Sequence, residues 1–141
     1  MNREVVSVNA SVTINEVAKV MEDTKVGAIV VMENNTPIGI VTDRDFAIKV
    51  ASHAYPITDS IKKIMSSPLI TIGTNESVWS IADLMHIRGI RKLPVVENDK
   101  VVGIVTATDL VKQFATATEE DMLKMYHQSV IKVYKTYSPY K

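Results

Sequence analysis

The chain has 141 residues, 46% of them hydrophobic, so it is long enough to bury roughly two-thirds of its unfolded surface in one compact body. Its 16 basic and 16 acidic residues give a formal net charge of zero, which excludes an overall field that attracts nucleic acid or an anionic membrane, and we expect neither partner. Without cysteine it has no disulfide or thiolate metal site, and without a signal peptide or a membrane-spanning apolar run it is expected to be cytoplasmic.

The first predicted elements are a short strand over residues 5–8 and a helix over about residues 13–23. Thr13 and Glu16 have the spacing of a capping box, in which each side chain satisfies a backbone N–H of the other residue. The apolar residues that follow occupy the i, i+3, i+4 and i+7 positions of an amphipathic helix: Ile14, Val17, Ala18 and Met21.

Two short β-rich runs come next, over residues 28–32 and 37–41. The polar residues 33–36 between them indicate the turn of a β-hairpin. Thr42 is then positioned as the N-cap of a final helix over residues 46–50. The predicted order of elements is therefore β-α-β-β-α.

The same elements recur 64 residues later. Residues 39–45 have the sequence Gly-Ile-Val-Thr-Asp-Arg-Asp, and residues 103–109 have the sequence Gly-Ile-Val-Thr-Ala-Thr-Asp. The offset holds without a gap from residues 5–52 to residues 69–116, with Ser77 as the cap of the second long helix. A period of this length that repeats once indicates two copies of one small fold rather than a solenoid.

The β-α-β-β-α order, the Leu-Pro-Val-Val strand at residues 93–96 and the Gly-Ile-Val-Thr-x-x-Asp start of the last helix resemble the cystathionine-β-synthase (CBS) domain. The resemblance covers about residues 5–116, and residues 61–65 are similar to the family's lead-in to a second copy. It implies an α+β (α/β) fold, a stand-alone Bateman module whose repeats pack with pseudo-twofold symmetry. The implied domains are residues 1–60, residues 61–117 and a C-terminal helical tail over residues 118–141. Such modules generally bind adenosine-containing ligands between the copies and regulate another protein.

A hydroxyl followed three residues later by a carboxylate places two polar groups on the first turn of each final helix. The carboxylate can accept both hydroxyls of a ribose, the helix N-terminus can bind a phosphate, and the Gly before the strand lets a flat ring approach the backbone. The same spacing is that of an ordinary capping box, and the two roles can coexist. The resemblance implies the ligand role for Thr42 with Asp45 and for Thr106 with Asp109.

Only one of the two implied ligand sites has two adjacent cations. Arg91 and Lys92 occupy the positions that Gly27 and Ala28 have in the first repeat, and basic residues there are similar to the phosphate contacts of nucleotide-binding relatives. Solvated surface charge is the alternative role. The implied main site consists of Val5, Val6, Val26, Gly27, Arg91, Lys92, Ile104, Thr106, Thr108 and Asp109. The implied second site, expected to be weaker or empty, consists of Ile40, Thr42, Arg44, Asp45, Ile70 and Ile90.

Neither catalysis nor metal binding is predicted. His53, His86 and His127 lie in different elements, with no second ligand at metal spacing. The sequence contains no nucleophile elbow, phosphate-binding Gly-rich loop or catalytic Cys–His set. Asp43 and Asp45 could form an acid–base pair, but only Asp45 has a counterpart in the second repeat. We therefore expect a protein that is not an enzyme and requires no cofactor.

Trp79 falls beside the buried stripe of its predicted helix, and an outward Trp indicates an interface. The tail carries an apolar stripe of Met122, Met125, Tyr126, Val130, Val133 and Tyr137. Because paired CBS modules commonly dimerise through such helices, a homodimer is expected. Shielding of Trp79 by the tail is the alternative.

The predicted function is a regulatory sensor that binds AMP, ADP or ATP and acts on an unidentified partner protein. A structural or protein-interaction module without bound ligand is the alternative from another functional class. S-adenosylmethionine is an alternative ligand, because it has the adenosine group but no phosphate, and Arg91 with Lys92 argue against it.

Overall fold

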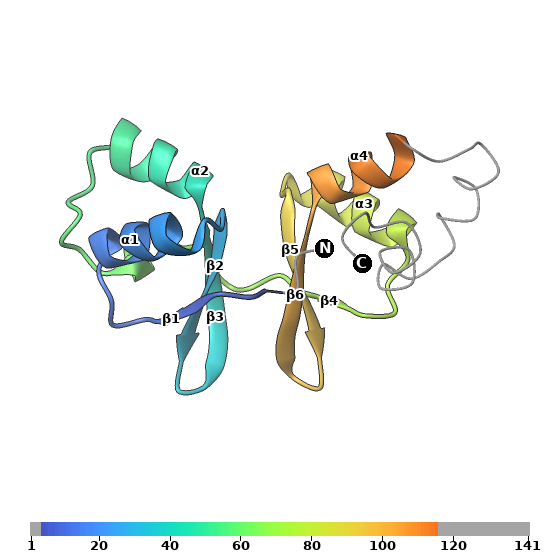
Figure 1. Cartoon of the computed structure of the whole chain (residues 1–141), viewed down its shortest axis with the longest axis horizontal. Coiled ribbons are helices and arrows are strands. Elements are labelled where there is room, and N and C mark those ends of the chain that lie inside the picture. The colour runs from blue at the N-terminus through green and yellow to red at the C-terminus, as the bar shows by residue number, and fades with distance from the viewer. Residues whose placement is uncertain (1–3, 116–141) are drawn as a thin grey trace. The chain divides into compact units, whose positions relative to one another are not determined.

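The computed structural model describes residues 4–115, which form two compact units. The first-repeat unit is Val5–Leu69, and the described part of the second-repeat unit is Glu4 with residues 70–115. Each unit has one three-stranded mixed sheet with its helices on one face (Figure 1). The predicted α+β class is confirmed. The predicted domain boundaries stay predictions, and the apolar stripe of residues 118–141 lies outside the described residues.

The first-repeat unit has the strand order β1-β2-β3, with β1 parallel to β2 and β2 antiparallel to β3. Its elements are β1 (Ser7–Asn9), α1 (Ile14–Thr24), β2 (Ala28–Glu33), β3 (Thr36–Thr42), α2 (Asp43–Asp45), the π-helical η1 (Phe46–Ser52) and the 3-10 helix η2 (Ile61–Lys63).

The second-repeat unit repeats this topology with the strand order β4-β5-β6. Its elements are β4 (Ile72–Gly73), α3 (Val78–Arg88), β5 (Lys92–Glu97), β6 (Lys100–Thr106) and α4 (Ala107–Ala115). The register of the hairpin shifts between Val31 and Met32 in one unit and between Val95 and Val96 in the other, which are equivalent positions. The two hairpins therefore share the same local irregularity.

The helices begin where the capping residues predict. Thr13 Oγ1 accepts the Glu16 N–H at 3.2 Å, and Glu16 Oε2 accepts the Thr13 N–H at 2.8 Å, so the predicted capping box starts α1. Ser77 Oγ accepts the Ser80 N–H at 3.1 Å at the start of α3. These bonds satisfy backbone donors that the first helical turn leaves without intrahelical partners.

Both hairpins close through two-residue turns. Asn34 and Asn35 have φ of 52° and 62°, and Asn98 and Asp99 have the same pair of values. Positive φ at both central residues is the geometry whose twist matches that of the flanking strands, and Asn and Asp tolerate it. The predicted hairpins are confirmed.

Several element boundaries differ from the predictions. The strands predicted at residues 5–8 and 69–72 are β1 at Ser7–Asn9 and β4 at Ile72–Gly73, because parallel pairing with the neighbouring strand, rather than the apolar run, sets the ladder. The helix predicted at residues 46–50 continues α2 as the π-helical η1. In this wider winding Phe46 and Val50 pack on the core, while the Lys49 ammonium reaches the Ile64 carbonyl.

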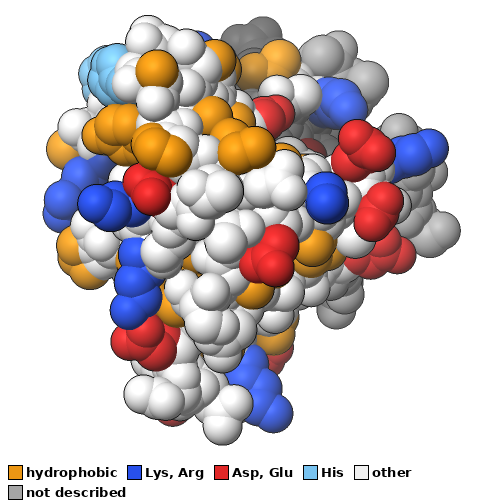
Figure 2. Space-filling view, turned by 90° about the vertical axis from the view of Figure 1, so that its left-hand side faces the viewer, with side chains coloured by type: hydrophobic (Ala, Val, Ile, Leu, Met, Phe, Trp, Pro, Cys, Tyr) orange, Lys and Arg blue, Asp and Glu red, His pale blue; other side chains and the backbone are white. Residues whose placement is uncertain are grey.

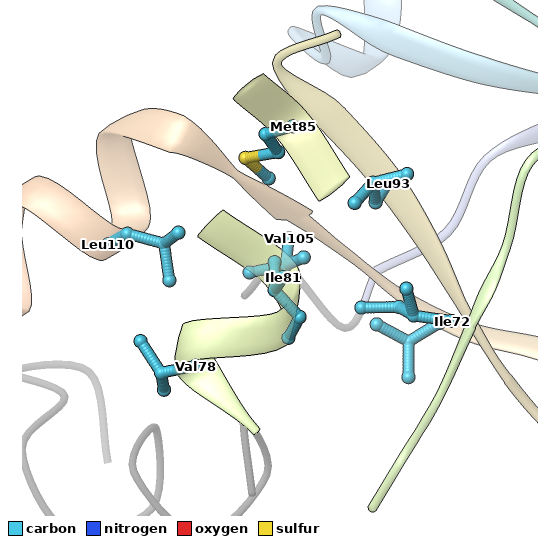
Figure 3. Close-up of a cluster of buried hydrophobic side chains, with 8 residues drawn as sticks. Ile72, Val78, Ile81, Met85, Leu93, Val105 and Leu110 are labelled. Atoms are coloured by element: carbon cyan, nitrogen blue, oxygen red, sulfur yellow. The ribbon is translucent and has the colours of Figure 1, made fainter. Parts of the chain in front are cut away.

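Each unit has its own hydrophobic core beneath its helices. In the first-repeat unit Ile14, Val17 and Ile29 are fully buried. In the second-repeat unit, Val78, Ile81 and Met85 of α3 point toward Leu93 and Val105 of the sheet (Figure 3). The predicted helical stripes therefore face the sheets.

Gly39 shows why a residue without a side chain stands at this point of β3. A Cβ there would lie 2.7 Å from Met65 Sδ and 2.9 Å from the Ser66 carbonyl oxygen. The Ile40 N–H donates to the Ser66 carbonyl at 3.1 Å, and the Ser66 N–H donates to the Ile40 carbonyl at 2.8 Å. The group that lies against the backbone at Gly39 is therefore the segment with Met65 and Ser66, which follows η2 in the same unit.

We expect Gly39→Ala to lower the free energy of unfolding by about 1–3 kcal/mol, because the added methyl overlaps a backbone oxygen and a packed sulfur. Urea denaturation followed by circular dichroism measures this change. Gly73→Ala is the matched control, since nothing lies within 4 Å of its added Cβ. Equal midpoints for Gly39→Ala and the unmodified chain would contradict the close packing of residues 65–66 on β3.

Candidate functional site

The junction between β6 and α4 brings the Thr106–Asp109 pair together. The Thr106 N–H donates to Asp109 Oδ2 at 2.9 Å, and the Asp109 N–H donates to Thr106 Oγ1 at 3.0 Å. Both residues are half-buried, Ile104 behind them is 6% exposed, and Thr108 is exposed on the first turn of α4. The pair is a complete capping box, so Thr106 and Asp109 cap the N-terminus of α4 as their spacing predicts.

Two cations lie at the start of the neighbouring strand. Lys92 of β5 pairs with Thr106 of β6 in the antiparallel ladder, and the Ala107 N–H donates to the Arg91 carbonyl at 2.8 Å. Side chains of directly paired residues have Cβ atoms roughly 4.5–5.5 Å apart, so Lys92 lies next to Thr106. Lys92 is half-buried and Arg91 is exposed. Their positive charge adds to the partial positive charge of the α4 N-terminus.

The equivalent junction of the first-repeat unit has the same backbone but lacks these cations. Ala28 pairs with Thr42, and the Asp43 N–H donates to the Gly27 carbonyl at 3.1 Å. Gly27 and Ala28 thus stand where Arg91 and Lys92 stand in the second-repeat unit. The sequence offset predicts two cations in one repeat and none at the equivalent residues of the other. The structure places these residues at the same point of both units, beside the Thr–Asp junction.

The Thr–Asp pair is also bonded differently in the first-repeat unit. The Thr42 N–H and hydroxyl both donate to Asp45 Oδ2, at 2.8 and 3.3 Å. Lys49 Nζ lies 3.4 Å from the other carboxylate oxygen, Oδ1, and donates to the Ile64 carbonyl at 2.7 Å. The sequence analysis did not identify Lys49. Lys49 follows Asp45 by four residues, which is the spacing of an ion pair on one helix face, and this spacing was visible in the sequence. The equivalent residue of the other repeat is the neutral Gln113.

The remaining predicted residues are divided between the two units. Val5, Val6, Val26 and Gly27 of the predicted main site belong to the first-repeat unit, and Ile70 with Ile90 of the predicted second site belong to the second-repeat unit. Ile40 is buried in β3, and Arg44 is exposed on α2. The grouping of these residues into common sites stays a prediction.

A shallow hollow of about 320 Å³ lies along α3, apart from the Thr106–Asp109 junction, and none of the predicted ligand residues lines it. Its apolar lining comes from Ile72, Trp79, Leu84 and Ile87. The exposed fractions of Trp79 and Ile87 are 58% and 68%, so the predicted outward direction of Trp79 is confirmed. Glu76 and Asp83 add negative charge to the same lining.

Metal ligands do not gather anywhere in the described chain. No group of three or more His, Cys, Asp or Glu side chains at metal distance exists within residues 4–115. His53 instead lies beside Tyr55, with ring centroids 6.1 Å apart, and His127 lies outside the described residues. Among the described helices, none is long and apolar enough to cross a bilayer.

The surface charges of the first-repeat unit do not form a basic patch on the face seen in Figure 2. Lys, Arg, Asp and Glu side chains are interspersed there, and apolar side chains gather toward the upper edge. A mixed surface of this kind does not provide the cationic stripe that binds a phosphodiester backbone.

Comparison with known proteins identifies the family to which this topology and its paired junctions belong. The CBS domain family matches residues 1–52 and 61–116. The chain is 33% identical over 132 residues to the CBS domain-containing protein YhcV of Bacillus subtilis, which covers 92% of this chain and 94% of YhcV. Its structure is similar to that of the CBS domain pair of protein MJ0100 in complex with 5′-methylthioadenosine and S-adenosyl-L-methionine. The TM-score is 0.71 and the sequence identity is 26%, and the match covers 82% of this chain and 91% of that pair.

A hexameric CBS-CP12 protein from bloom-forming cyanobacteria has a similar structure, with a TM-score of 0.74 and 26% identity over 88% of this chain and 77% of that protein. The family match covers both sheets and both strand-to-helix junctions of the chain. This chain therefore belongs to the CBS domain family and carries two tandem copies of the domain.

Proposed function

We propose that this CBS pair is a regulatory module that binds an adenine nucleotide, AMP, ADP or ATP, at the Thr106–Asp109 junction. The observation that supports this most directly is the register of β5 and β6, because it sets Lys92 beside Thr106 and Arg91 beside the first residue of α4. Binding then changes how the module associates with a regulated protein. No catalytic step is proposed.

The junction offers one group for each part of a nucleotide. An ionised carboxylate has about four acceptor sites on its two oxygens, so Asp109 can accept ribose hydroxyls while Oδ2 keeps its bond to the Thr106 N–H. Arg91, Lys92 and the N-terminus of α4 supply positive charge for the phosphate. The capping role and the ligand role are therefore compatible at the same residues.

Two alternatives remain, and each differs from the proposal in a measurable way. S-adenosyl-L-methionine occurs in the complex of the similar MJ0100 pair, and it would use Asp109 without using Arg91 and Lys92 for a phosphate. A protein-interaction module would bind no adenosine compound. The adenine-facing roles of Val5, Val6, Val26 and Gly27, and the weaker second site at Asp45, stay predictions.

We expect AMP or ATP to raise the melting temperature by several degrees, because a ligand at one hundred times its Kd adds about 2.7 kcal/mol of stability. Asp109→Asn should remove most of this shift, since it loses the charge that orders the ribose hydroxyls while keeping the size of the side chain. The shift is measured by differential scanning fluorimetry against each variant's own ligand-free melting temperature.

Asp45→Asn is the control, because it makes the same change at the equivalent junction that lacks the two cations. It should leave most of the AMP shift intact. Absence of any shift with AMP, ADP, ATP or S-adenosylmethionine at millimolar concentration would support the interaction module instead.

Phosphate dependence tests the role of the two cations. Replacing Arg91 and Lys92 together with Ala should weaken AMP binding at least about tenfold, because charge-assisted hydrogen bonds contribute roughly 1.5–3 kcal/mol each. Adenosine binding should change less than about twofold. Calorimetric titration measures both ligands, and Lys63→Ala with Lys100→Ala is the control that removes two exposed cations elsewhere. Equal losses for AMP and adenosine would refute the phosphate role.

We further propose that the chain forms a homodimer through the α3 surface. The similar CBS-CP12 protein is hexameric, and Trp79 with Ile87 presents large apolar area beside the hollow on α3. Exposed apolar area of this kind generally marks a protein interface. A module that regulates another protein also needs a surface through which to act.

Sedimentation equilibrium should give twice the chain mass of 15.6 kDa. Trp79→Ala with Ile87→Ala should raise the dimer dissociation constant at least about tenfold, because buried aromatic anchors contribute most to interface energies. Val111→Ala is the control, since this residue is 64% exposed on α4. A monomer at high concentration would refute the proposed homodimer.

A further inference from the structure

Lys49 lies on η1, and its side chain is 32% exposed. Its ammonium lies 3.4 Å from Asp45 Oδ1 and donates to the Ile64 carbonyl at 2.7 Å. The other oxygen of Asp45 accepts from the N–H and the hydroxyl of Thr42. Both oxygens of this carboxylate are therefore engaged by groups of the chain itself.

The anchor of Lys49 is rigid, which distinguishes this ion pair from an ordinary surface pair. Ile61 and Ile64 are fully buried, and Ser66 is bonded through its N–H and its carbonyl to Ile40 of β3. The ammonium therefore bonds to a carbonyl in a segment that is held in place on both sides. Exposed ion pairs contribute little because long side chains lose entropy when they are ordered, but here the bond to Ile64 already orders Lys49. The Asp45 side chain is 14% exposed.

We propose that Lys49 closes the Thr42–Asp45 junction to ribose and thereby restricts nucleotide binding by this chain to the Thr106–Asp109 junction. The inference rests on the proposed function, because it concerns which of two equivalent carboxylates accepts the ligand. At about two acceptor sites on each oxygen, the two Thr42 donors fill Oδ2 and the Lys49 ammonium takes one site of Oδ1. A ribose diol that donates twice to Asp45 must therefore displace either the Thr42 hydroxyl or the ammonium. Displacing the ammonium leaves its charge beside the Ile64 carbonyl without its carboxylate partner.

The other repeat has a neutral residue at the equivalent position, since Gln113 corresponds to Lys49 through the offset of 64. A neutral amide cannot form the ion pair by which Lys49 holds Asp45. The chain therefore offers its own substitution for the test: Lys49→Gln gives the first repeat the side chain of the second. Gln also keeps an N–H donor for the Ile64 carbonyl, which limits the loss of packing.

The test measures AMP binding by calorimetric titration in the Asp109→Ala background, where the Thr106–Asp109 junction no longer binds ribose. Asp109→Ala alone should bind AMP weakly or not at all. Adding Lys49→Gln should strengthen binding at least about tenfold, which corresponds to about 1.4 kcal/mol. Adding Asp45→Ala to that variant should abolish the gain, and Lys49→Arg, which keeps a cation, should give none. Circular dichroism and the melting temperature show that each variant is folded.

Unchanged or weaker AMP binding on adding Lys49→Gln would overturn the inference, and a loss would identify Lys49 as a cation that holds the ligand. The result for the unmodified chain separates this inference from the proposed function. If the unmodified chain binds AMP but the Lys49→Gln variant of Asp109→Ala does not, only the inference on Lys49 fails. If that variant binds AMP and the unmodified chain does not, the proposed site at Asp109 fails while the inference on Lys49 holds.

Discussion

The strand pairing of each hairpin is set by a two-residue turn with positive φ at both central residues and by a one-residue register shift beyond it, and the composition of each candidate site depends on that pairing. Side chains alternate between the faces of a strand, so a slip of one residue would turn every side chain to the opposite face. The register places Ala28 opposite Thr42 in one unit and Lys92 opposite Thr106 in the other. The turn and the register shift together thus decide which groups meet at the far end of each hairpin.

The two repeats place their cations at different positions of this common scaffold. In the first-repeat unit the cation comes from the helix itself, where Lys49 contacts the carboxylate of Asp45. In the second-repeat unit the cations Arg91 and Lys92 come from the adjacent strand, next to the helix N-terminus. A cation that contacts the carboxylate competes with a neutral diol, and cations near the helix N-terminus also favour an anion. The two junctions share the backbone pairing of their strands but differ in the charged side chains beside them.

The elements that were predicted correctly are those specified by residues close together in the chain. The capping box of Thr13 with Glu16 and the helical stripe with Ile14 and Val17 involve contacts within one or two turns, so their spacing is visible in the sequence. The ends of β1 and β4 were misplaced because a parallel partner strand, distant in sequence, sets them. The π-helical winding of η1 was not predicted, and neither was the bond from Lys49 to Ile64, which lies fifteen residues away.

By itself, the sequence determined the tandem repeat, the hairpins, the helix starts and the Thr–Asp pairs, because each depends on short-range spacing that the second copy confirms independently. Only the tertiary structure decided that Met65 and Ser66 fill the space beside Gly39 and that Lys49 holds Asp45 while bonded to the Ile64 carbonyl. Backbone carbonyls carry no residue-specific signal, and every residue has one. Which carbonyl contacts which side chain is therefore set by the tertiary packing of segments that are distant in the sequence.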